Sequence, residues 1–385
     1  MRLFINSLAA NAGGGLTYIR NTLPLLAANP DLQITVAIAP SLRREFSGLT
    51  NIEFLEQELS TSRRFQYEQN ELPREIREHR SDVLLSAGNF ALRKSPVPQI
   101  LLSRNSVYTS RDFYRDLWSR GEYRAWMETH FRGWLARKSI KWADVTVAPS
   151  RAFADELHRW TGKDVRAIHH GFDSDTFFRD DCPLSPEVEA KLTAAEGSFR
   201  LLFVSHYNYY RNFETLLRAL PLIQRSFAPR AIKLLLTCKF LEGQNPGAYH
   251  PESAARMVRD LNLRDVVVEL GAIPYHQLHL LYRRADLYVT PAYTETFAHP
   301  LVEAMASSLP IVASDLAVHR EICAEAARYF PTFSPTDLAE TVAQVAEAPT
   351  VGENMAANGR KRVGHFSWKK HVSEILELAK SLIDA

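Results

Sequence analysis

The chain of 385 residues is too long for one typical hydrophobic core, which predicts two domains. Its 46% hydrophobic and 23% charged residues are typical of a soluble globular protein. The net charge of +2 argues against a general nucleic-acid binder, and no uninterrupted apolar stretch of about 18 residues predicts a membrane-spanning helix.

Apolar runs that favour strands alternate with helical patterns through the first half of the chain. The predicted strands there lie at residues 3–5, 33–39, 82–86, 99–103 and 145–148. After the first strand we expect a glycine-rich turn at Gly13, Gly14 and Gly15, and then a helix over residues 16–28. This alternation is typical of βαβ units and a parallel sheet.

The same pattern restarts at Phe199. Strands are predicted at residues 201–205, 232–237, 266–270, 285–290 and 311–314, with helices at 213–224, 300–307 and 335–348. We therefore predict an α/β protein with two doubly wound Rossmann-like domains facing a central cleft. The expected parts are a first domain (1–172), a linker (173–198), a second domain (199–365) and an amphipathic helix (366–385) returning to the first domain.

The cysteines and the N-terminus favour a cytoplasmic protein. Cys182, Cys238 and Cys323 form no CxxC pair, as expected in a reducing compartment. Met1 leads directly into a strand, without the long apolar region and small-residue cleavage site of a signal peptide.

The stretch from Pro291 to Glu303 is the most informative in the sequence. It follows a buried strand, and Pro300 stands where a helix is expected to begin, a position that favours proline. Backbone N–H groups before a helix, together with the helix dipole, suit an anionic diphosphate or a sugar hydroxyl. Glu295 and Glu303 can each accept two hydrogen bonds from a vicinal diol, although an acid near a helix start is often only solvated.

Two other strand-to-helix loops carry candidate residues. Residues 204–212 contain His206, Arg211 and Asn212, and a guanidinium there can bind two oxygens of a departing diphosphate. Gly14 and Gly15 permit a close backbone approach to a ligand, although three glycines in a row are a weak signal.

These three motifs, in this order and spacing, resemble family 4 of the retaining glycosyltransferases, which have the GT-B fold. Residues 282–315 are similar to the family's signature almost residue for residue. The similarity includes the two glutamates, Glu295 and Glu303, which have seven residues between them in this chain and in the family. Weaker similarities occur at residues 143–150, 170–173, 271–274 and 319–321. The resemblance is strong from about 200 to 330 and weaker in the first half.

The resemblance implies that the first domain (1–172) binds the acceptor and the second (199–365) the nucleotide sugar, and it implies a role for each matching position. Glu303 would hold the ribose hydroxyls of the nucleotide, Glu295 the hydroxyls of the donor sugar, and Arg211 the phosphates. His206 stands where the family usually has an arginine, which puts one phosphate contact in doubt. The implied catalytic residues are Glu295, Arg211 and His206, and the implied donor-binding residues are Gly14, Gly15, Arg211, Asn212, Gly271, Ile273, Glu295, Phe297, Ala298, His299, Leu301 and Glu303.

The resemblance also implies the chemistry. A nucleotide-diphosphate sugar would be the donor, without a cofactor or metal, since no Asp-x-Asp motif ends a predicted strand. Arg104 and Asn105 are placed on the acceptor side, where many relatives have a histidine. The acceptor can be a glycan, a lipid-linked molecule or a small molecule. Two other interpretations stay open: a nucleotide-sugar epimerase of similar fold, and a catalytically idle sugar-nucleotide-binding protein.

Residues 104–142 contain four of the six tryptophans, interleaved with arginines and lysines. This composition suits a peripheral contact with the inner face of a membrane. The alternative, which we favour from the sequence, is that the aromatic side chains pack into the first domain and the arginines face solvent.

Overall fold

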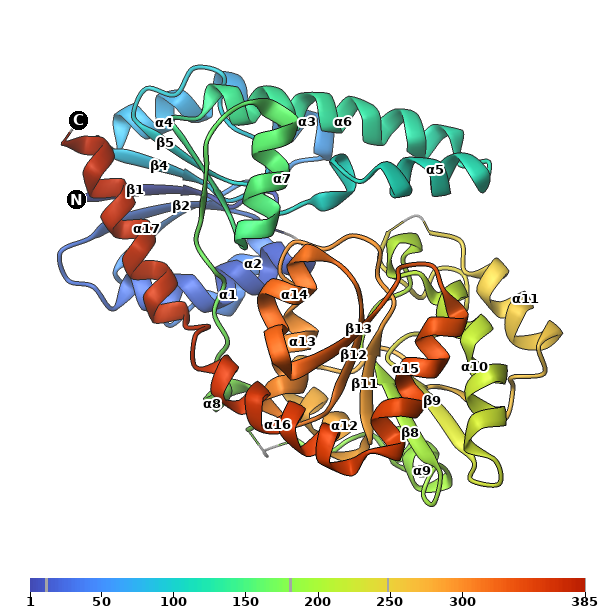
Figure 1. Ribbon diagram of the computed structural model, residues 1–385. Coiled ribbons are helices and arrows are strands. Elements are labelled where there is room, and N and C mark those ends of the chain that lie inside the picture. The colour runs from blue at the N-terminus through green and yellow to red at the C-terminus, as the bar shows by residue number, and fades with distance from the viewer. Residues whose placement is uncertain (11–12, 180–181, 248, 385) are drawn as a thin grey trace. The chain divides into compact units, whose positions relative to one another are not determined.

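The structure is a computed structural model that describes residues 1–10, 13–179, 182–247 and 249–384. Its contacts divide the chain into two compact units. Unit 1 comprises Met1–Ser110, Leu117–Gly171 and Phe366–Ala385, and unit 2 comprises Arg111–Asp116 and Phe172–His365. Each unit is a parallel sheet with helices on both faces (Figure 1), which confirms the predicted pair of Rossmann-like domains.

The described part of unit 1 forms a seven-stranded sheet with β1 near its centre. In sheet order the strands are β3 (Ile52–Glu56), β2 (Gln33–Ile38), β1 (Arg2–Asn6), β4 (Val83–Ser86), β5 (Gln99–Leu102), β6 (Val145–Ala148) and β7 (Val165–Ala167). The helices are α1 (Gly13–Ala27), α2 (Pro40–Arg43), α3 (Thr61–Asn70), α4 (Leu72–Glu78), α5 (Arg111–Ser119, shared with unit 2), α6 (Tyr123–Trp142), α7 (Arg151–Thr161) and α17 (Trp368–Ile383).

Alternate residues of each central strand point into two separate hydrophobic cores. In β1, Leu3 and Ile5 belong to the core shared with α1 and α17, whereas Phe4 belongs to the core shared with α3 and α4. Both faces of the strand are therefore buried, which explains why residues 3–5 are all apolar.

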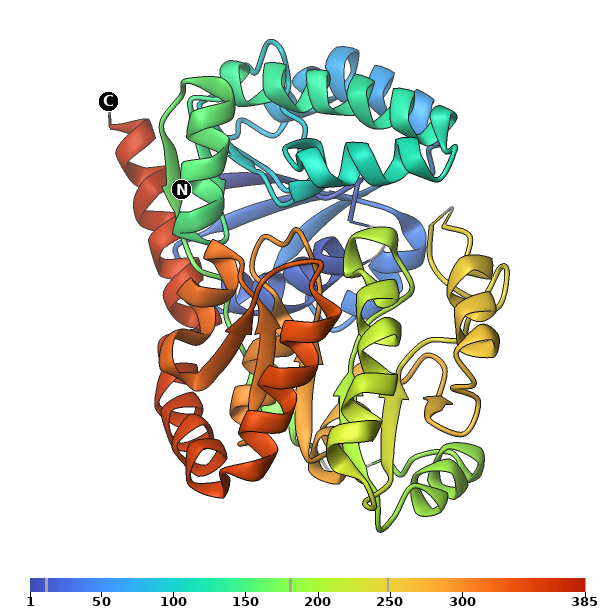
Figure 2. The same ribbon diagram turned by 45° about the vertical axis from the view of Figure 1, so that its right-hand side comes forward.

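Helix α17 is last in the chain but packs in unit 1, beside α1 (Figures 1 and 2). Trp368, Val372 and Ile375 are buried in the same core as Leu3 and Ile5. Ser367 caps the helix by accepting a hydrogen bond from the Lys370 backbone N–H.

The described residues of unit 2 form a six-stranded parallel sheet. Its strands, in sheet order, are β10 (Val267–Glu269), β9 (Ile232–Leu236), β8 (Phe199–Phe203), β11 (Leu287–Thr290), β12 (Ile311–Ser314) and β13 (Ala327–Phe330). The helices are α8 (Ser174–Phe177), α9 (Pro186–Ala194), α10 (Phe213–Phe227), α11 (Glu252–Asp260), α12 (Leu278–Arg284), α13 (His299–Ala306), α14 (Ala317–Cys323), α15 (Pro335–Glu347) and α16 (Pro349–Val363).

The structure differs from the sequence prediction in three places. The glycines expected in a turn form the first turn of α1, which begins at Gly13. The segment 173–198, expected as a linker, carries α8 and α9 and belongs to unit 2. Strands β3, β7 and β13 were not predicted.

Candidate functional site

Three adjacent strands of unit 2 lead into the segments of the candidate site, and the predicted catalytic residues follow the first two. The order β8–β11–β12 places residues 204–212, residues 291–298 and the start of α14 side by side. Because parallel strands end at the same edge of a sheet, side chains from distant parts of the sequence meet there.

Arg211 and Glu295 form an ion pair between the first two of these loops. Their side chains are only 21% and 12% exposed, and Arg211 Nη1 donates to Glu295 Oε2. The neighbouring Asn212 donates from its side chain to the Pro291 carbonyl oxygen, 3.0 Å away. Two side chains of the β8 loop therefore fix the position of the β11 loop.

The ion pair sets the charge of Glu295. Burial alone would raise the pKa of this carboxyl, but the Arg211 guanidinium and the neighbouring hydrogen bonds together lower the pKa below its usual range. A backbone hydrogen bond of 3.0 Å from the Thr296 N–H acts in the same direction. Glu295 is therefore a carboxylate at neutral pH, and it can accept hydrogen bonds from sugar hydroxyls.

His319 of α14 belongs to the same cluster, because the charges of Glu295 and Arg211 both act on the pKa of its imidazole. Burial lowers the pKa of its imidazole, so the ring is neutral at pH 7. Its Nδ1 lies 2.9 Å from the Ser314 carbonyl oxygen, so Nδ1 carries the proton and Nε2 is an acceptor. Within the described residues, neither His319 Nε2 nor Arg211 Nε has a partner, although both are buried.

Glu303 is almost completely buried, with 4% of its surface exposed. Burial raises the pKa of its carboxyl to about 7, and a 2.9 Å hydrogen bond from the Tyr282 hydroxyl only partly opposes this shift. Tyr282 in turn stacks against Tyr288, with ring centroids 5.8 Å apart. Glu303 is thus a buried carboxyl group that a tyrosine hydroxyl holds in place, and its pKa lies close to neutral pH.

The N-terminus of α13 differs slightly from the expectation. The helix begins at His299, so Glu303 lies in its second turn rather than in the first. Ala298, the residue before the helix, has a left-handed backbone with φ of 63°. The side chains of Phe297 and Leu301 are both 1% exposed, so they support the loop from inside.

The predicted base-binding segment follows β10. Gly271 has a φ of +82°, and a Cβ there would lie 3.2 Å from Lys239 Cε, which explains the glycine. Ile273 is half-buried. The segment continues to Tyr275, whose pKa is raised by burial and by the charge of Glu303. Because the charge of Glu303 acts on this pKa, the segment lies in the neighbourhood of Glu303.

His206 lies in the β8 loop with Arg211. Partial burial and the positive charge of Arg211 lower the pKa of its imidazole, so it is neutral at pH 7. It cannot supply the positive charge that an arginine would bring to this position.

Four predicted residues belong to unit 1. Gly14 and Gly15 lie in the first turn of α1, and Arg104 Nη1 donates to the Gly14 carbonyl oxygen over 3.0 Å. Arg104 also lies over the Tyr18 ring, and burial lowers the pKa of its guanidinium to about 10. Asn105 accepts a 3.3 Å hydrogen bond from the Val107 N–H. Gly14, Gly15 and Arg104 thus form a local cluster, whereas Asn105 caps a short helical turn.

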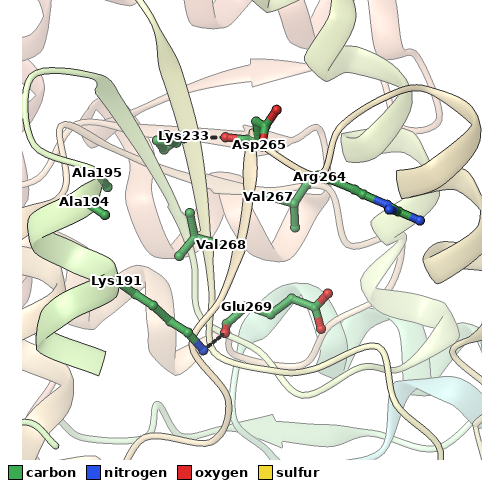
Figure 3. A pocket seen from close by; sticks show the side chains of 9 residues that line it. All are labelled: Lys191, Ala194, Ala195, Lys233, Arg264, Asp265, Val267, Val268 and Glu269. Carbon is green, nitrogen blue, oxygen red and sulfur yellow. Dashed lines mark hydrogen bonds between the residues drawn. The ribbon is translucent and has the colours of Figure 1, made fainter. Parts of the chain in front are cut away.

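A separate pocket of about 410 Å³ lies beside the edge strand β10, where Lys191 donates to the Glu269 carbonyl oxygen over 3.0 Å (Figure 3). None of the predicted donor-binding residues lines it. This pocket is therefore distinct from the Arg211–Glu295 cluster.

Sequence reasoning did not identify Tyr282, Tyr288 or His319 as functional residues. All three lie in segments that resemble the family, but nothing in their spacing indicated a hydrogen bond to Glu303, a stacked ring beside it or a buried acceptor nitrogen. In the part of the chain that the structure describes, no three His, Cys, Asp or Glu side chains form a candidate metal site. No described helix is long and apolar enough to cross a membrane.

Comparison with solved structures agrees with this architecture. The chain is similar to sucrose-phosphate synthase from Thermosynechococcus elongatus, with a TM-score of 0.76, 18% identity and coverage of 100% and 99% of the two chains. It is also similar to HepE from Anabaena in complex with UDP-glucose, with a TM-score of 0.72, 16% identity and coverage of 99% and 100%. The fold is that of the GT-B glycosyltransferases.

Two family models match the two halves of the chain. The model described as Glycosyltransferase Family 4 matches residues 12–176, and the model described as Glycosyl transferases group 1 matches residues 185–362. The chain belongs to this family of glycosyltransferases, as the sequence resemblance predicted.

Curated relatives match over shorter stretches. The O-antigen chain mannosyltransferase RfbU of Salmonella typhimurium is 39% identical over 77 residues, or 20% of this chain and 22% of that protein. D-inositol 3-phosphate glycosyltransferase 2 of Catenulispora acidiphila is 28% identical over 232 residues, or 59% of this chain and 53% of that protein. The chain thus spans about half the length of these relatives, or less.

Proposed function

We propose that the chain is a retaining glycosyltransferase that moves a sugar from a nucleoside-diphosphate donor to a glycan, lipid-linked or small-molecule acceptor. The observation that carries this proposal is the buried Arg211–Glu295 pair beside two unpartnered polar atoms, Arg211 Nε and His319 Nε2. Buried polar atoms without partners are costly, so a ligand with matching groups would bind there. A phosphate oxygen matches the Arg211 donor, and a sugar hydroxyl matches the His319 acceptor.

The donor would lie along the carboxyl ends of the unit 2 strands. Glu303 would accept hydrogen bonds from the ribose diol, and the segment from Gly271 to Tyr275 would contact the base. Glu295 and the N-terminus of α13 would hold the donor sugar. The charge of Glu303 acts on the pKa of Tyr275, which supports placing these two segments on the same side of the nucleoside.

The proposed reaction depends on stabilising the departing diphosphate. Arg211 Nη1 is engaged by Glu295, whereas Nε has no partner among the described residues and can donate to a phosphate oxygen. The positive end of the α13 dipole adds to this attraction. The sugar becomes oxocarbenium-like as the bond breaks, and the leaving phosphate takes the acceptor's proton on the same face, which gives retention. Positive charge from the protein would serve in place of a metal ion.

The base, the sugar and the location also belong to the proposal. HepE, which has the same fold, binds UDP and UDP-glucose, so UDP-glucose is the first donor to test. The cysteine pattern favours the cytoplasm as the setting. The neutral His206 keeps one competing function open, a sugar-nucleotide-binding protein without turnover.

A thermal-shift panel of UDP, GDP, ADP and dTDP, each with and without its sugar, tests donor binding. One nucleotide at about 100 times its Kd should stabilise the wild type by about 2.7 kcal/mol, and Glu303→Ala should abolish this shift. The matched control is Glu214→Ala, because Glu214 is also buried in unit 2 and also accepts a tyrosine hydrogen bond. This control should lower the Tm but keep the ligand-induced shift.

Product analysis then separates the candidate functions. A transferase releases nucleoside diphosphate only with an acceptor present, and NMR of the product should show the anomeric configuration of the donor. Binding without turnover would identify the idle protein. Inversion of configuration would overturn the retaining mechanism.

A further inference from the structure

The outward face of α6 combines exposed apolar side chains with cations. Tyr123, Met127, Phe131 and Trp134 are between 53% and 64% exposed. At about 100° per residue, their spacing of four, four and three residues places them within an arc of about 80° and a length of about 17 Å. They form one stripe, which we call the α6 stripe.

Beyond Trp134, the face of α6 that carries the α6 stripe presents basic side chains. Lys138 and Lys141, both exposed, fall on the line of the α6 stripe one and two turns beyond Trp134. Over residues 117–142 the chain carries six basic and two acidic side chains, and the described acid in α6, Glu128, pairs with Arg132 outside the stripe. The stripe is therefore apolar along three turns, basic at its end, and without a carboxylate.

A groove lies beside the α6 stripe, within unit 1. It encloses about 1170 Å³ between α3, α6 and the loop after β4, and Phe131 and Trp134 line both the groove and the stripe. Phe65, Phe90 and Trp142 complete its aromatic wall. At this volume it can hold a long apolar chain.

Two cations at the groove lack a counter-charge. Arg93 and Lys94 line it and are exposed, and neither has a carboxylate within 4.0 Å in the described part of the chain. The other two cations that line the groove are compensated: Arg64 lies 4.0 Å from Glu68, and Arg132 pairs with Glu128. An anionic group on the occupant would complement Arg93 and Lys94.

The charges decide which occupant fits. A second copy of the chain would bring Lys138 and Lys141 against its own cations, which disfavours self-association. A small soluble ligand in the groove would leave the α6 stripe in water. An anionic lipid surface matches both features, because aromatic side chains and lysines suit the headgroup region and an apolar chain suits the groove.

We propose that unit 1 binds an anionic lipid at a membrane surface, with the α6 stripe among the headgroups and the lipid's apolar chain in the α3–α6 groove. This binding does not depend on the proposed transfer reaction.

Co-sedimentation of the full chain with vesicles tests the proposal. We expect binding to vesicles of phosphatidylcholine with phosphatidylglycerol, a loss of at least about tenfold on phosphatidylcholine alone, and weakening at high salt. Met127→Ser with Phe131→Ser should reduce binding at least about tenfold, and so should Lys138→Glu with Lys141→Glu. Since all four side chains are exposed, these variants should fold, as circular dichroism would check.

Matched controls come from unit 2. Leu241→Ser with Phe333→Ser removes two other exposed apolar side chains, 52% and 47% exposed, and Arg218→Glu with Arg225→Glu reverses two exposed cations of α10. Both should bind vesicles like the wild type. The proposal would be overturned if the controls lost as much vesicle binding as the α6 variants, or if the wild type did not bind vesicles. It would also be overturned if the wild type formed a dimer that Phe131→Ser abolished.

Brominated lipids test the groove separately. Phosphatidylglycerol with bromine deep in its acyl chain should quench tryptophan fluorescence, and Trp142→Phe should remove part of that quenching, whereas Trp160→Phe on α7 should not. Vesicle binding without quenching of Trp142 would show that the α6 stripe binds alone and would overturn the groove assignment.

Discussion

Arg211 and Glu295 share a buried position in unit 2, and each charge is stable there because of the other. Removing one partner of such a pair leaves an uncompensated charge, which costs about 3–5 kcal/mol. We expect Arg211→Met to lower the free energy of unfolding by this amount at pH 7, measured by urea denaturation. Arg211→Met combined with Glu295→Met should recover most of the loss.

The pH dependence of this effect follows from the pKa of Glu295. Because its folded pKa is below the unfolded value, the stabilisation is present above about pH 4.3 and is lost as the pH falls through the folded pKa. The difference between wild type and Arg211→Met should therefore shrink in acid. Arg200→Met is the control, because its partner Asp286 is 29% exposed whereas Glu295 is 12% exposed, and it should cost at most about 1 kcal/mol. If Arg211→Met lowered the free energy of unfolding by no more than about 1 kcal/mol, the Arg211–Glu295 pair would not behave as a buried ion pair.

Glu303 should produce the opposite pH dependence. Its folded pKa of about 7 lies above the unfolded value, so the folded state binds the proton more tightly. The stabilisation is complete below about pH 4.3 and is lost as the pH rises through 7, a change of roughly 4 kcal/mol. Unfolding free energies measured between pH 5 and 8 should fall with pH in the wild type, and Glu303→Gln should flatten this slope. An unchanged slope in Glu303→Gln would assign the effect to another group.

The sequence predicted the charged residues of the cluster better than their supports. Arg211 and Glu295 could be placed because each follows a strand whose apolar run is evident, and parallel strands end at one edge. Tyr282 and His319 could not, because a tyrosine in a short helix and a histidine in a loop-to-helix segment are common in protein cores. Their roles depend on side-chain contacts that spacing does not reveal.

Gly171 shows how one residue controls the docking of a helix. A Cβ at this position would lie 2.0 Å from the Trp368 backbone nitrogen at the start of α17, and backbone cannot move aside as a flexible side chain can. We expect Gly171→Ala to cost at least about 2 kcal/mol of unfolding free energy through overpacking. Gly48→Ala, where the added Cβ meets nothing within 4 Å, should be nearly neutral in the same denaturation experiment. Similar stabilities for the two variants would contradict this account.

The strands that the sequence did not reveal share one property: β3, β7 and β13 are edge strands. An edge strand is partly exposed, so its sequence mixes charged and apolar residues, as Glu53, Arg166 and Arg328 show. The central strands β1, β8 and β11 are largely buried by helices on both faces and have mostly apolar sequences, with Arg200 of β8 as a charged exception. Apolar runs therefore predicted the centres of both sheets and failed at three of their edges.

The chain leaves unit 1 after Gly171, builds most of unit 2, and returns at Phe366 to complete unit 1. Unit 1 consequently depends on the last segment of the sequence. Five side chains of α17, Trp368, Val372, Ile375, Leu376 and Ala379, are buried in its core. Burial of each large apolar side chain contributes about 1.5–3 kcal/mol, so their sum is comparable with the stability of a whole domain.

Deleting residues 366–385 should therefore unfold unit 1 and spare unit 2, whose sheet and helices lie within residues 172–365 apart from a short segment of α5. Hydrogen exchange followed by mass spectrometry should show loss of protection over residues 1–110 and 117–171 and its retention over most of 172–365. The control is Lys369→Ala with Lys380→Ala, which alters the exposed face of α17 and should leave protection unchanged. Equal loss of protection in both units would mean that unit 2 cannot fold without unit 1, whereas full protection in both would mean that α17 adds little to the unit 1 core.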